Sequence, residues 1–317
     1  MKKTLILIIL LSGMGLLSAC DFTDEEVDIY TTIYPVEFLV KEIVGNTLSV
    51  KSIYPRGKEV HDYESSPKDL ITLSNAKIIF YIGLGLEMFI EKAKTSTLAN
   101  VPTISLSDNI LVVLLNTTDY ATMIHGDINE ENVFYDPHIW LDPNKMIVMA
   151  DTVLQYVITY FADTQEKLEF YTNKATILKN ELAALDSEFT AVVNDPAIAN
   201  KTIMVDHDAY VYWTVRYGID RIKLRNDNES SDVVPQEIEA KIALAESLGI
   251  KNIVVSKNEM ESSIVSQYLS ALGLTAEAKV GLHHLGTITS EEEDAGMDYY
   301  SIMRDNIDVI ADILPKL

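Results

Sequence analysis

Cysteine is almost absent from this chain. Cys20 is the only thiol in 317 residues, and it lies near the N-terminus, so the folded part can hold no disulfide framework, thiolate metal site or cysteine nucleophile. Basic residues are also scarce, with 25 Lys and Arg against 48 Asp and Glu and a net charge of −23. Because nucleic-acid binding requires a basic surface that faces phosphates, this composition argues against DNA or RNA as a partner.

The N-terminus lacks an apolar run long enough for a membrane-spanning helix, which needs ~20 residues. It does follow the pattern of a secretory signal, with lysines at positions 2 and 3, an apolar run over 5–11 and small residues before Cys20. The run Leu17-Ser18-Ala19-Cys20 resembles a bacterial lipobox, in which the cysteine is diacylated at sulfur and becomes the first mature residue. An ordinary signal peptide with an incidental cysteine is the alternative.

We therefore expect a signal peptide at 1–19, a lipid on Cys20, a polar tether over 20–26 and a place on the extracytoplasmic face of a cell membrane. Removal of residues 1–19 takes away two lysines and no acid, which leaves 23 basic and 48 acidic residues and a net charge of −25. A negative surface concentrates cations, but it also keeps an exported protein soluble, so the charge alone names no ligand.

The mature chain, of about 290 residues, is larger than a single hydrophobic core usually supports, so we expect two lobes. Apolar runs alternate with helical patterns, which predicts an α/β fold of two Rossmann-like lobes with mainly parallel sheets, at 27–163 and 195–317. Strands are expected at 29–33, 48–53, 78–82, 202–205, 252–256 and 276–280, and helices at 35–44, 67–73, 87–94, 144–160, 209–217, 235–248, 261–272 and 297–314.

A long helical stretch joins the two lobes. Asp163, followed by Glu166 three residues later, predicts a capped helix start. Apolar residues then recur at spacings of three and four, with no glycine or proline before Pro196: Leu168, Tyr171, Ala175, Leu178, Leu182, Leu185, Phe189 and Val192. We assign 164–194 to a spine helix ~45 Å long that runs along both lobes. A coiled-coil dimer is the alternative, but so short a stripe between α/β patterns favours an intramolecular spine and a monomer.

Histidine is the residue type that carries chemistry here. The chain has six, and most lie where a strand or loop is expected to meet a helix: His61, His138, His207, and His283 or His284. In doubly wound sheets, ligands bind at the carboxyl ends of the strands, so these residues could converge on a cleft between the lobes.

Four ordered motifs resemble those of the zinc and manganese solute-binding proteins of ABC transporters. The likeness covers about residues 29–314 and rests on these runs: Gly57 to Asp69 (GKEVHDYESSPKD), Asp136 to Pro143 (DPHIWLDP), Val205 to Tyr212 (VDHDAYVY) and Tyr300 to Asn306 (YSIMRDN). The resemblance implies capture of a divalent metal outside the cytoplasm and its delivery to the permease of an ABC importer.

The resemblance also implies the metal ligands. His61 and His138 would come from the first lobe and His207 from the second. The family's fourth ligand is commonly an aspartate in a turn that reads Leu282-His283-His284 here, so by position His283 replaces it, with His284 or water as alternatives.

The ligand types favour zinc over manganese. Neutral imidazoles suit zinc, whereas manganese prefers carboxylates and water, and the manganese branch of the family usually has glutamate at the place of His207. Acidic neighbours could orient the imidazoles and offset the ionic charge. Glu64 and Asp142 are the first candidates because they belong to the motifs, and Asp62, Asp206 and Asp208 are further ones.

Other functions are weaker alternatives. A manganese- or iron-binding member of the same family fits the same chain. A zinc-dependent hydrolase would need an open coordination position and a base such as Glu64 or Asp142, but the sequence has no His-Glu-x-x-His or Gly-x-Ser-x-Gly motif. We expect no enzymatic activity. A surface adhesin fits the same anchor, and the acidic loop that contains His125 reads as a plain surface loop.

Overall fold

The computed structural model describes residues 27–61, 63–113, 123–125, 135–225, 235–258 and 261–317. The predicted signal peptide, Cys20, the tether and Asp62 lie outside the described residues. None of the described helices combines the length and the apolar character needed to cross a membrane.

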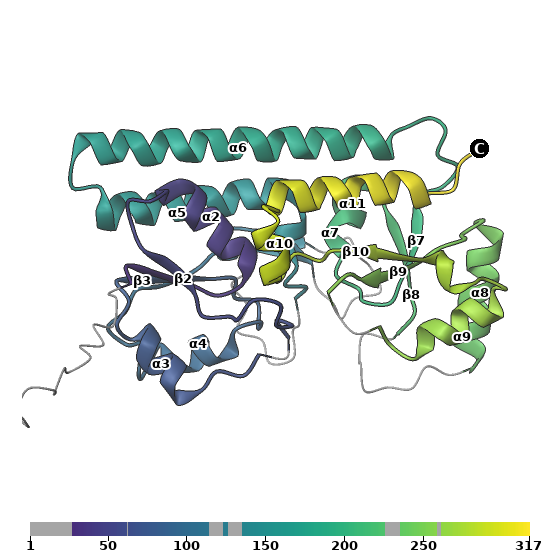
Figure 1. Ribbon diagram of the computed structural model, residues 1–317, viewed down its shortest axis with the longest axis horizontal. Coiled ribbons are helices and arrows are strands. Elements are labelled where there is room, and N and C mark those ends of the chain that lie inside the picture. The colour runs from purple at the N-terminus through teal and green to yellow at the C-terminus, as the bar shows by residue number, and fades with distance from the viewer. Residues whose placement is uncertain (1–26, 62, 114–122, 126–134, 226–234, 259–260) are drawn as a thin grey trace, which may run out of the picture.

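Two four-stranded parallel sheets form the centres of two lobes (Figure 1). The N-terminal sheet has the order β2-β1-β3-β4 and comprises β1 (Ile29–Thr31), β2 (Val50–Ser52), β3 (Ile78–Tyr81) and β4 (Thr103–Ser105). The C-terminal sheet has the order β10-β9-β7-β8 and comprises β7 (Thr202–Val205), β8 (Asp220–Lys223), β9 (Ile253–Ser256) and β10 (Lys279–Leu282). The predicted α/β class with mainly parallel sheets is confirmed.

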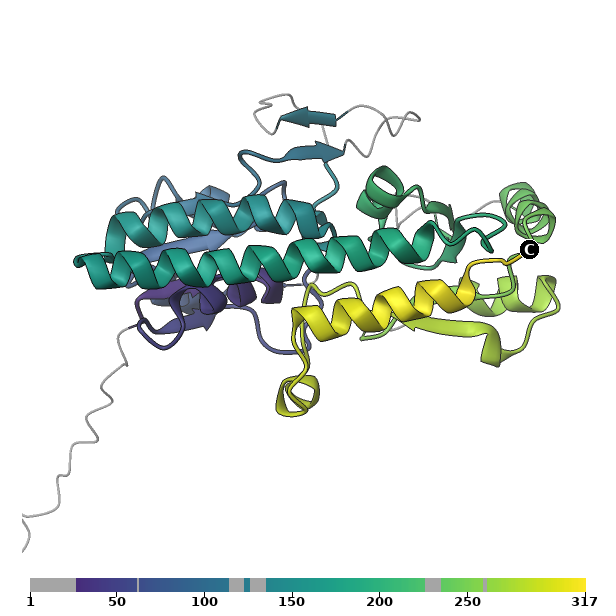
Figure 2. The same ribbon diagram turned by 90° about the horizontal axis from the view of Figure 1, so that it is seen from above.

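A short antiparallel hairpin was not expected from the sequence. It pairs β5 (Leu111–Val113) with β6 (Met123–His125), with Leu111 opposite His125. The backbone of His125 therefore belongs to a strand instead of a loop, while residues 126–134 lie outside the described residues. In the view from above, the hairpin stands apart from both parallel sheets (Figure 2).

The helices cover the sheets and connect the strands. In the N-terminal lobe they are α2 (Tyr34–Val44), α3 (Pro67–Leu73), α4 (Met88–Ala93) and α5 (Pro143–Phe161), with a 3-10 turn η1 (Ile139–Leu141) before α5. In the C-terminal lobe they are α7 (Val211–Tyr217), α8 (Pro235–Ser247), α9 (Ile264–Ala271), η2 (Ala276–Ala278), α10 (Ser290–Asp294) and α11 (Tyr299–Ile313). Because η2 occupies 276–278, the last strand begins at Lys279, three residues later than predicted.

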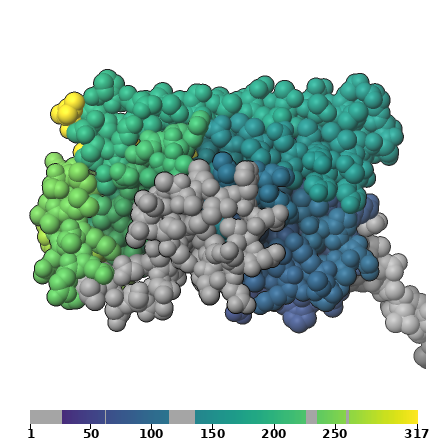
Figure 3. Space-filling model, turned by 180° about the vertical axis from the view of Figure 1, so that it is seen from behind, coloured from purple at the N-terminus to yellow at the C-terminus, as the bar shows by residue number. Residues whose placement is uncertain are grey.

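The long helix α6 (Gln165–Val193) runs along both lobes (Figures 1, 2 and 3). Thr164 caps it, because its side chain accepts the N–H of Lys167 at 3.2 Å, so the predicted cap at Asp163 is wrong by one residue. The buried stripe of α6 contains most of the predicted residues, from Tyr171 to Phe189, and ends at Val193. It packs against α5, α2 and α11, so the stripe that suggested a coiled coil is covered within the chain.

Candidate metal centre

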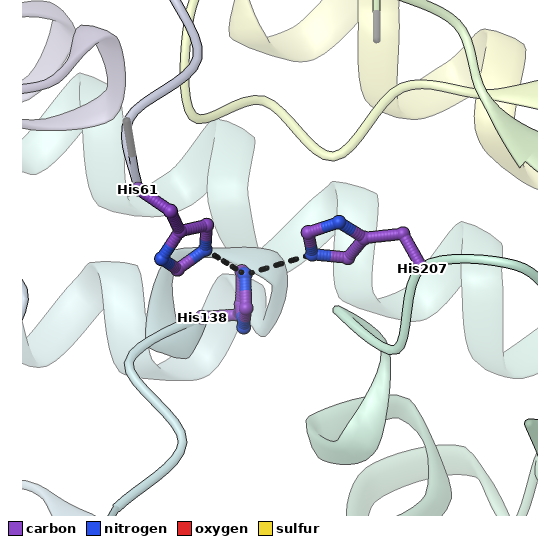
Figure 4. A group of neighbouring side chains, drawn as sticks. All are labelled: His61, His138 and His207. Carbon is purple, nitrogen blue, oxygen red and sulfur yellow. Dashed lines mark hydrogen bonds between the residues drawn. The ribbon is translucent and has the colours of Figure 1, made fainter. Parts of the chain in front are cut away.

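The three motif histidines come from three separate loops that meet between the lobes (Figure 4). His61 lies between β2 and α3, His138 directly precedes η1, and His207 follows β7 by two residues. Local capping orders the loop after His61, since Ser66 and Asp69 form a reciprocal capping box at the start of α3 and Tyr63 donates its hydroxyl to Asp69. The carboxyl end of β7 delivers His207 to the same place, as the rule for parallel sheets requires.

The nitrogens of these rings are spaced as the ligands of a single ion would be. Nε2 of His138 lies 3.2 Å from Nε2 of His61 and 3.5 Å from Nε2 of His207, and one ligand atom from each of the three lies within 4.8 Å of the others. A tetrahedral ion with nitrogens at ~2.0–2.1 Å holds neighbouring ligand nitrogens ~3.3–3.4 Å apart. The donor set and its spacing therefore fit a first-row divalent metal.

Comparison with known proteins agrees with this geometry. The sequence profile of the ZnuA family, described as zinc-uptake complex component A, periplasmic, matches residues 29–313. The chain belongs to the ZnuA family. The predicted relationship to zinc and manganese solute-binding proteins is thereby confirmed.

The sequence identity between this chain and individual relatives is low. The zinc-binding protein AdcA of Streptococcus pyogenes is 27% identical over 294 residues, which are 90% of this chain and 55% of that protein. This chain thus spans about half the length of such relatives. The manganese ABC transporter substrate-binding lipoprotein PsaA of Streptococcus anginosus is 24% identical over the full length of both chains. Among solved structures, zinc-bound AdcA from Streptococcus pneumoniae has a similar fold, with a TM-score of 0.72, 21% identity, and coverage of 91% of this chain and 58% of that one.

In this member of the ZnuA family, Asp136 orients the central imidazole. Its Oδ1 accepts both the backbone N–H of His138 at 2.8 Å and the ring Nδ1–H of His138 at 2.9 Å. A proton on Nδ1 leaves the lone pair of Nε2 directed at the other two histidines. Burial raises the pKa of Asp136 to about 7, although the N–H of His138 opposes the shift. A cation in the centre would favour the charged carboxylate.

Sequence reasoning missed Asp136, although it lies inside a quoted motif. The available signal was an aspartate two residues before the histidine, a spacing at which the carboxylate bonds to the backbone of its own turn. The role expected of Asp142 is different in the structure: its Oδ1 accepts the N–H of Asn144 at 2.9 Å and caps α5. Glu64 is exposed on the segment after His61.

Two further predicted carboxylates are bound to groups other than imidazoles. Asp206 accepts the backbone N–H of Ser262 at 2.8 Å and lies 3.4 Å from Arg225. Asp208 pairs with Arg221 and lies 3.6 Å from Lys223. These contacts hold the residues on both sides of His207. Asp206 and Asp208 therefore act on the position of His207 through the backbone of its loop.

The adjacent histidines of the last motif point in different directions. His283 lies away from the cluster: its Nδ1 accepts the N–H of Leu285 at 2.8 Å, and its Nε2 lies 2.8 Å from the amide of Asn258. Burial and, to a smaller extent, the neighbouring His284 lower the pKa of His283 to about 4, so this ring is neutral near pH 7. His283 therefore has the environment of a structural histidine.

His284 lies beside the cluster instead. It is 1% exposed, and its ring stacks on that of His207 with a centroid distance of 5.7 Å and an interplanar angle of 9°. Its Nδ1 accepts the N–H of Gly286 at 3.2 Å, which leaves the proton on Nε2, 3.6 Å from the carboxylate of Glu59. Of the two histidines, His284 is the one near the three grouped rings.

Proposed function

We propose that this chain captures zinc outside the cytoplasm and delivers it to the permease of an ABC importer in the same membrane. The observation that carries the proposal is the spacing of the Nε2 atoms of His61, His138 and His207, which suits one tetrahedral ion. Neutral imidazoles rank zinc far above manganese in the Irving–Williams order. The names of the AdcA relatives support the same cargo.

The proposal includes a fourth ligand and a division of the chain. We assign the fourth position to His284, which would have to release the proton on Nε2 and turn toward the ion, and we assign His283 a structural role. The lobes span 27–163 and 195–317 and are joined by the spine at 164–194. The chain acts as a monomer, held in the membrane by a lipid on Cys20, in agreement with relatives that are named lipoproteins. It has no enzymatic activity.

Manganese is the second candidate cargo because the full-length relative PsaA is named for manganese transport. Elemental analysis of the purified mature chain, followed by competitive titration of zinc against manganese, separates the two. We expect one zinc ion per chain and an affinity for zinc that exceeds the affinity for manganese by orders of magnitude. His207→Glu should narrow that preference, because it supplies the oxygen ligand that manganese favours. Equal affinities in the wild-type protein would contradict the proposal.

A further inference from the structure

An ion pair joins the lobes at the segment that precedes His61. Arg56 lies in the turn after β2, five residues before His61. Its Nε and Nη2 donate to the carboxylate of Glu293 on α10, at 3.0 and 2.9 Å. The same guanidinium binds Glu37 of α2, with Nη2 3.1 Å from Oε1. Arg56 thus connects a buried carboxylate of the N-terminal lobe with a carboxylate of the C-terminal lobe.

Backbone contacts join the same two segments. The N–H of Gly57 is shared between the carbonyl of Ile288 at 3.0 Å and the hydroxyl of Thr287 at 2.9 Å. The N–H of Tyr34, at the start of α2, donates to the carbonyl of Gly286 at 3.2 Å. We call residues 284–293 the interlobe segment. It runs from His284 beside the histidine cluster to α10, which contains Glu293.

The backbone of Gly57 has the left-handed conformation that favours glycine. Gly57 has a φ of +69°, and a Cβ atom placed there would lie 3.6 Å from Thr289 of the interlobe segment. A side chain would be strained by the positive φ rather than by lack of space. Arg56 and Gly57 therefore supply two kinds of donor to the other lobe, the guanidinium of Arg56 and the backbone N–H of Gly57.

We propose that Arg56 is a positioning residue, whose pair with Glu293 holds the segment that carries His61 against the interlobe segment and so slows the loss of metal. The part that concerns metal rests on the proposed function, whereas the contact between the two segments, which we call the latch, does not. Metal can leave only when a ligand moves away, and His61 is the exposed member of the three. Any contact that limits the motion of its segment should therefore lower the dissociation rate.

The informative variant is Glu293→Gln. It removes only the interlobe half of the network, whereas a change at Arg56 would also deprive Glu37 of a partner, and the side chain of Glu37 is 4% exposed. Glu188→Gln is a matched control. Glu188 accepts two bonds from Arg304 at 2.9 and 3.2 Å, and its side chain is 45% exposed, close to the 48% of Glu293. That pair joins α11 to α6 and does not involve the segment of His61.

Zinc dissociation from the full mature chain is measured by transfer to an excess of a chelating dye. Exposed ion pairs contribute little, so we expect Glu293→Gln to release zinc about two- to fivefold faster at low salt, and Glu188→Gln to match the wild-type protein. The difference should shrink at ~1 M salt, because screening weakens the pair in the wild-type protein as well. Equal rates for the two variants at low salt would overturn the proposal.

Hydrogen exchange of the metal-free protein tests the latch separately. We expect residues 56–61 to exchange faster in Glu293→Gln than in Glu188→Gln, since the N–H of Gly57 loses support from the neighbouring ion pair. A wild-type chain that binds no zinc would refute the proposed function and leave this result standing. A chain that binds zinc but shows unchanged exchange and unchanged dissociation in Glu293→Gln would refute the latch alone.

Discussion

Asp136 offers a test of the metal centre that keeps all three grouped histidines in place. Its Oδ1 accepts two bonds from His138, at 2.8 Å from the backbone N and 2.9 Å from Nδ1, and the residue is 1% exposed. Loss of such an orienting partner typically lowers metal affinity ~10–100-fold, or about 1.4–2.7 kcal/mol. Asp136→Asn keeps an acceptor oxygen, so the zinc affinity of this variant should fall about tenfold. Asp136→Ala leaves both N–H donors of His138 without this acceptor, so the loss of zinc affinity should approach 100-fold.

The assay is competitive zinc titration against a chelator of known affinity at pH 7. Asp186→Asn is the control, because the carboxylate of Asp186 binds Arg216 and Tyr217 instead of a histidine. Thermal melts without metal show whether each variant folds. If Asp136→Ala is folded and binds zinc within twofold of the wild-type affinity, or if Asp186→Asn weakens binding as much, Asp136 does not tune the centre.

Three other outcomes follow from particular residues. His284→Ala should weaken zinc binding at least ~10-fold, whereas His283→Ala should lower stability with little change in zinc affinity. Competitive titration checks both variants, and a larger loss of affinity in His283→Ala would identify His283 as the fourth ligand instead. Burial raises the pKa of Glu87 from 4.5 to about 7, so between these values the folded chain holds a proton that the unfolded chain has released, and stability falls as pH rises. Relative to Glu87→Gln, the free energy of unfolding of the wild-type protein should therefore drop by about 3 kcal/mol from pH 4.5 to 8 in denaturant titrations, and a constant difference would contradict this. Cys20→Ala should release the protein from membranes, and fractionation that finds it still bound would disprove the lipid anchor.

The positions of most helices could be predicted because local signals agreed with the fold. The helix over Pro67–Leu73 has the predicted bounds, since Ser66 supplies a cap and the proline fits the first turn. The start of α6 was placed one residue early because Asp163 and Thr164 are both good capping residues. Only the bond from Lys167 to the Thr164 side chain decides between them.

The candidate site was predictable to the extent that it follows from topology. The expected position of His207 depended on the carboxyl end of a parallel strand, and the structure places it beside His61 and His138. The sequence could not separate His283 from His284, because adjacent residues differ only in the tertiary contacts of their rings. In the structure, the ring of His283 lies beside the amide of Asn258 and that of His284 stacks on His207.

The three grouped histidines differ in how firmly the fold holds them, and this difference bears on how metal enters. His138 lies on the segment 136–141, which the C-terminal lobe binds from several sides. Tyr212 donates to the carbonyl of Asp136, and Trp213 and Tyr299 donate to those of Leu141 and Trp140. Trp140 in turn donates to the carbonyl of His284 at 2.7 Å.

Both lobes also share one apolar core along α5, α6 and α11, so a large rotation of one lobe against the other would break packed contacts in many places. His61 is the exposed member of the three and reaches the cluster from a loop. The least costly way to open the centre is therefore a local movement of the segment that carries His61, with His138 fixed. If this chain binds metal as proposed, we expect the rate of metal exchange to depend on the contacts of residues 56–61, and we expect α6 to hold the lobes at a nearly constant separation.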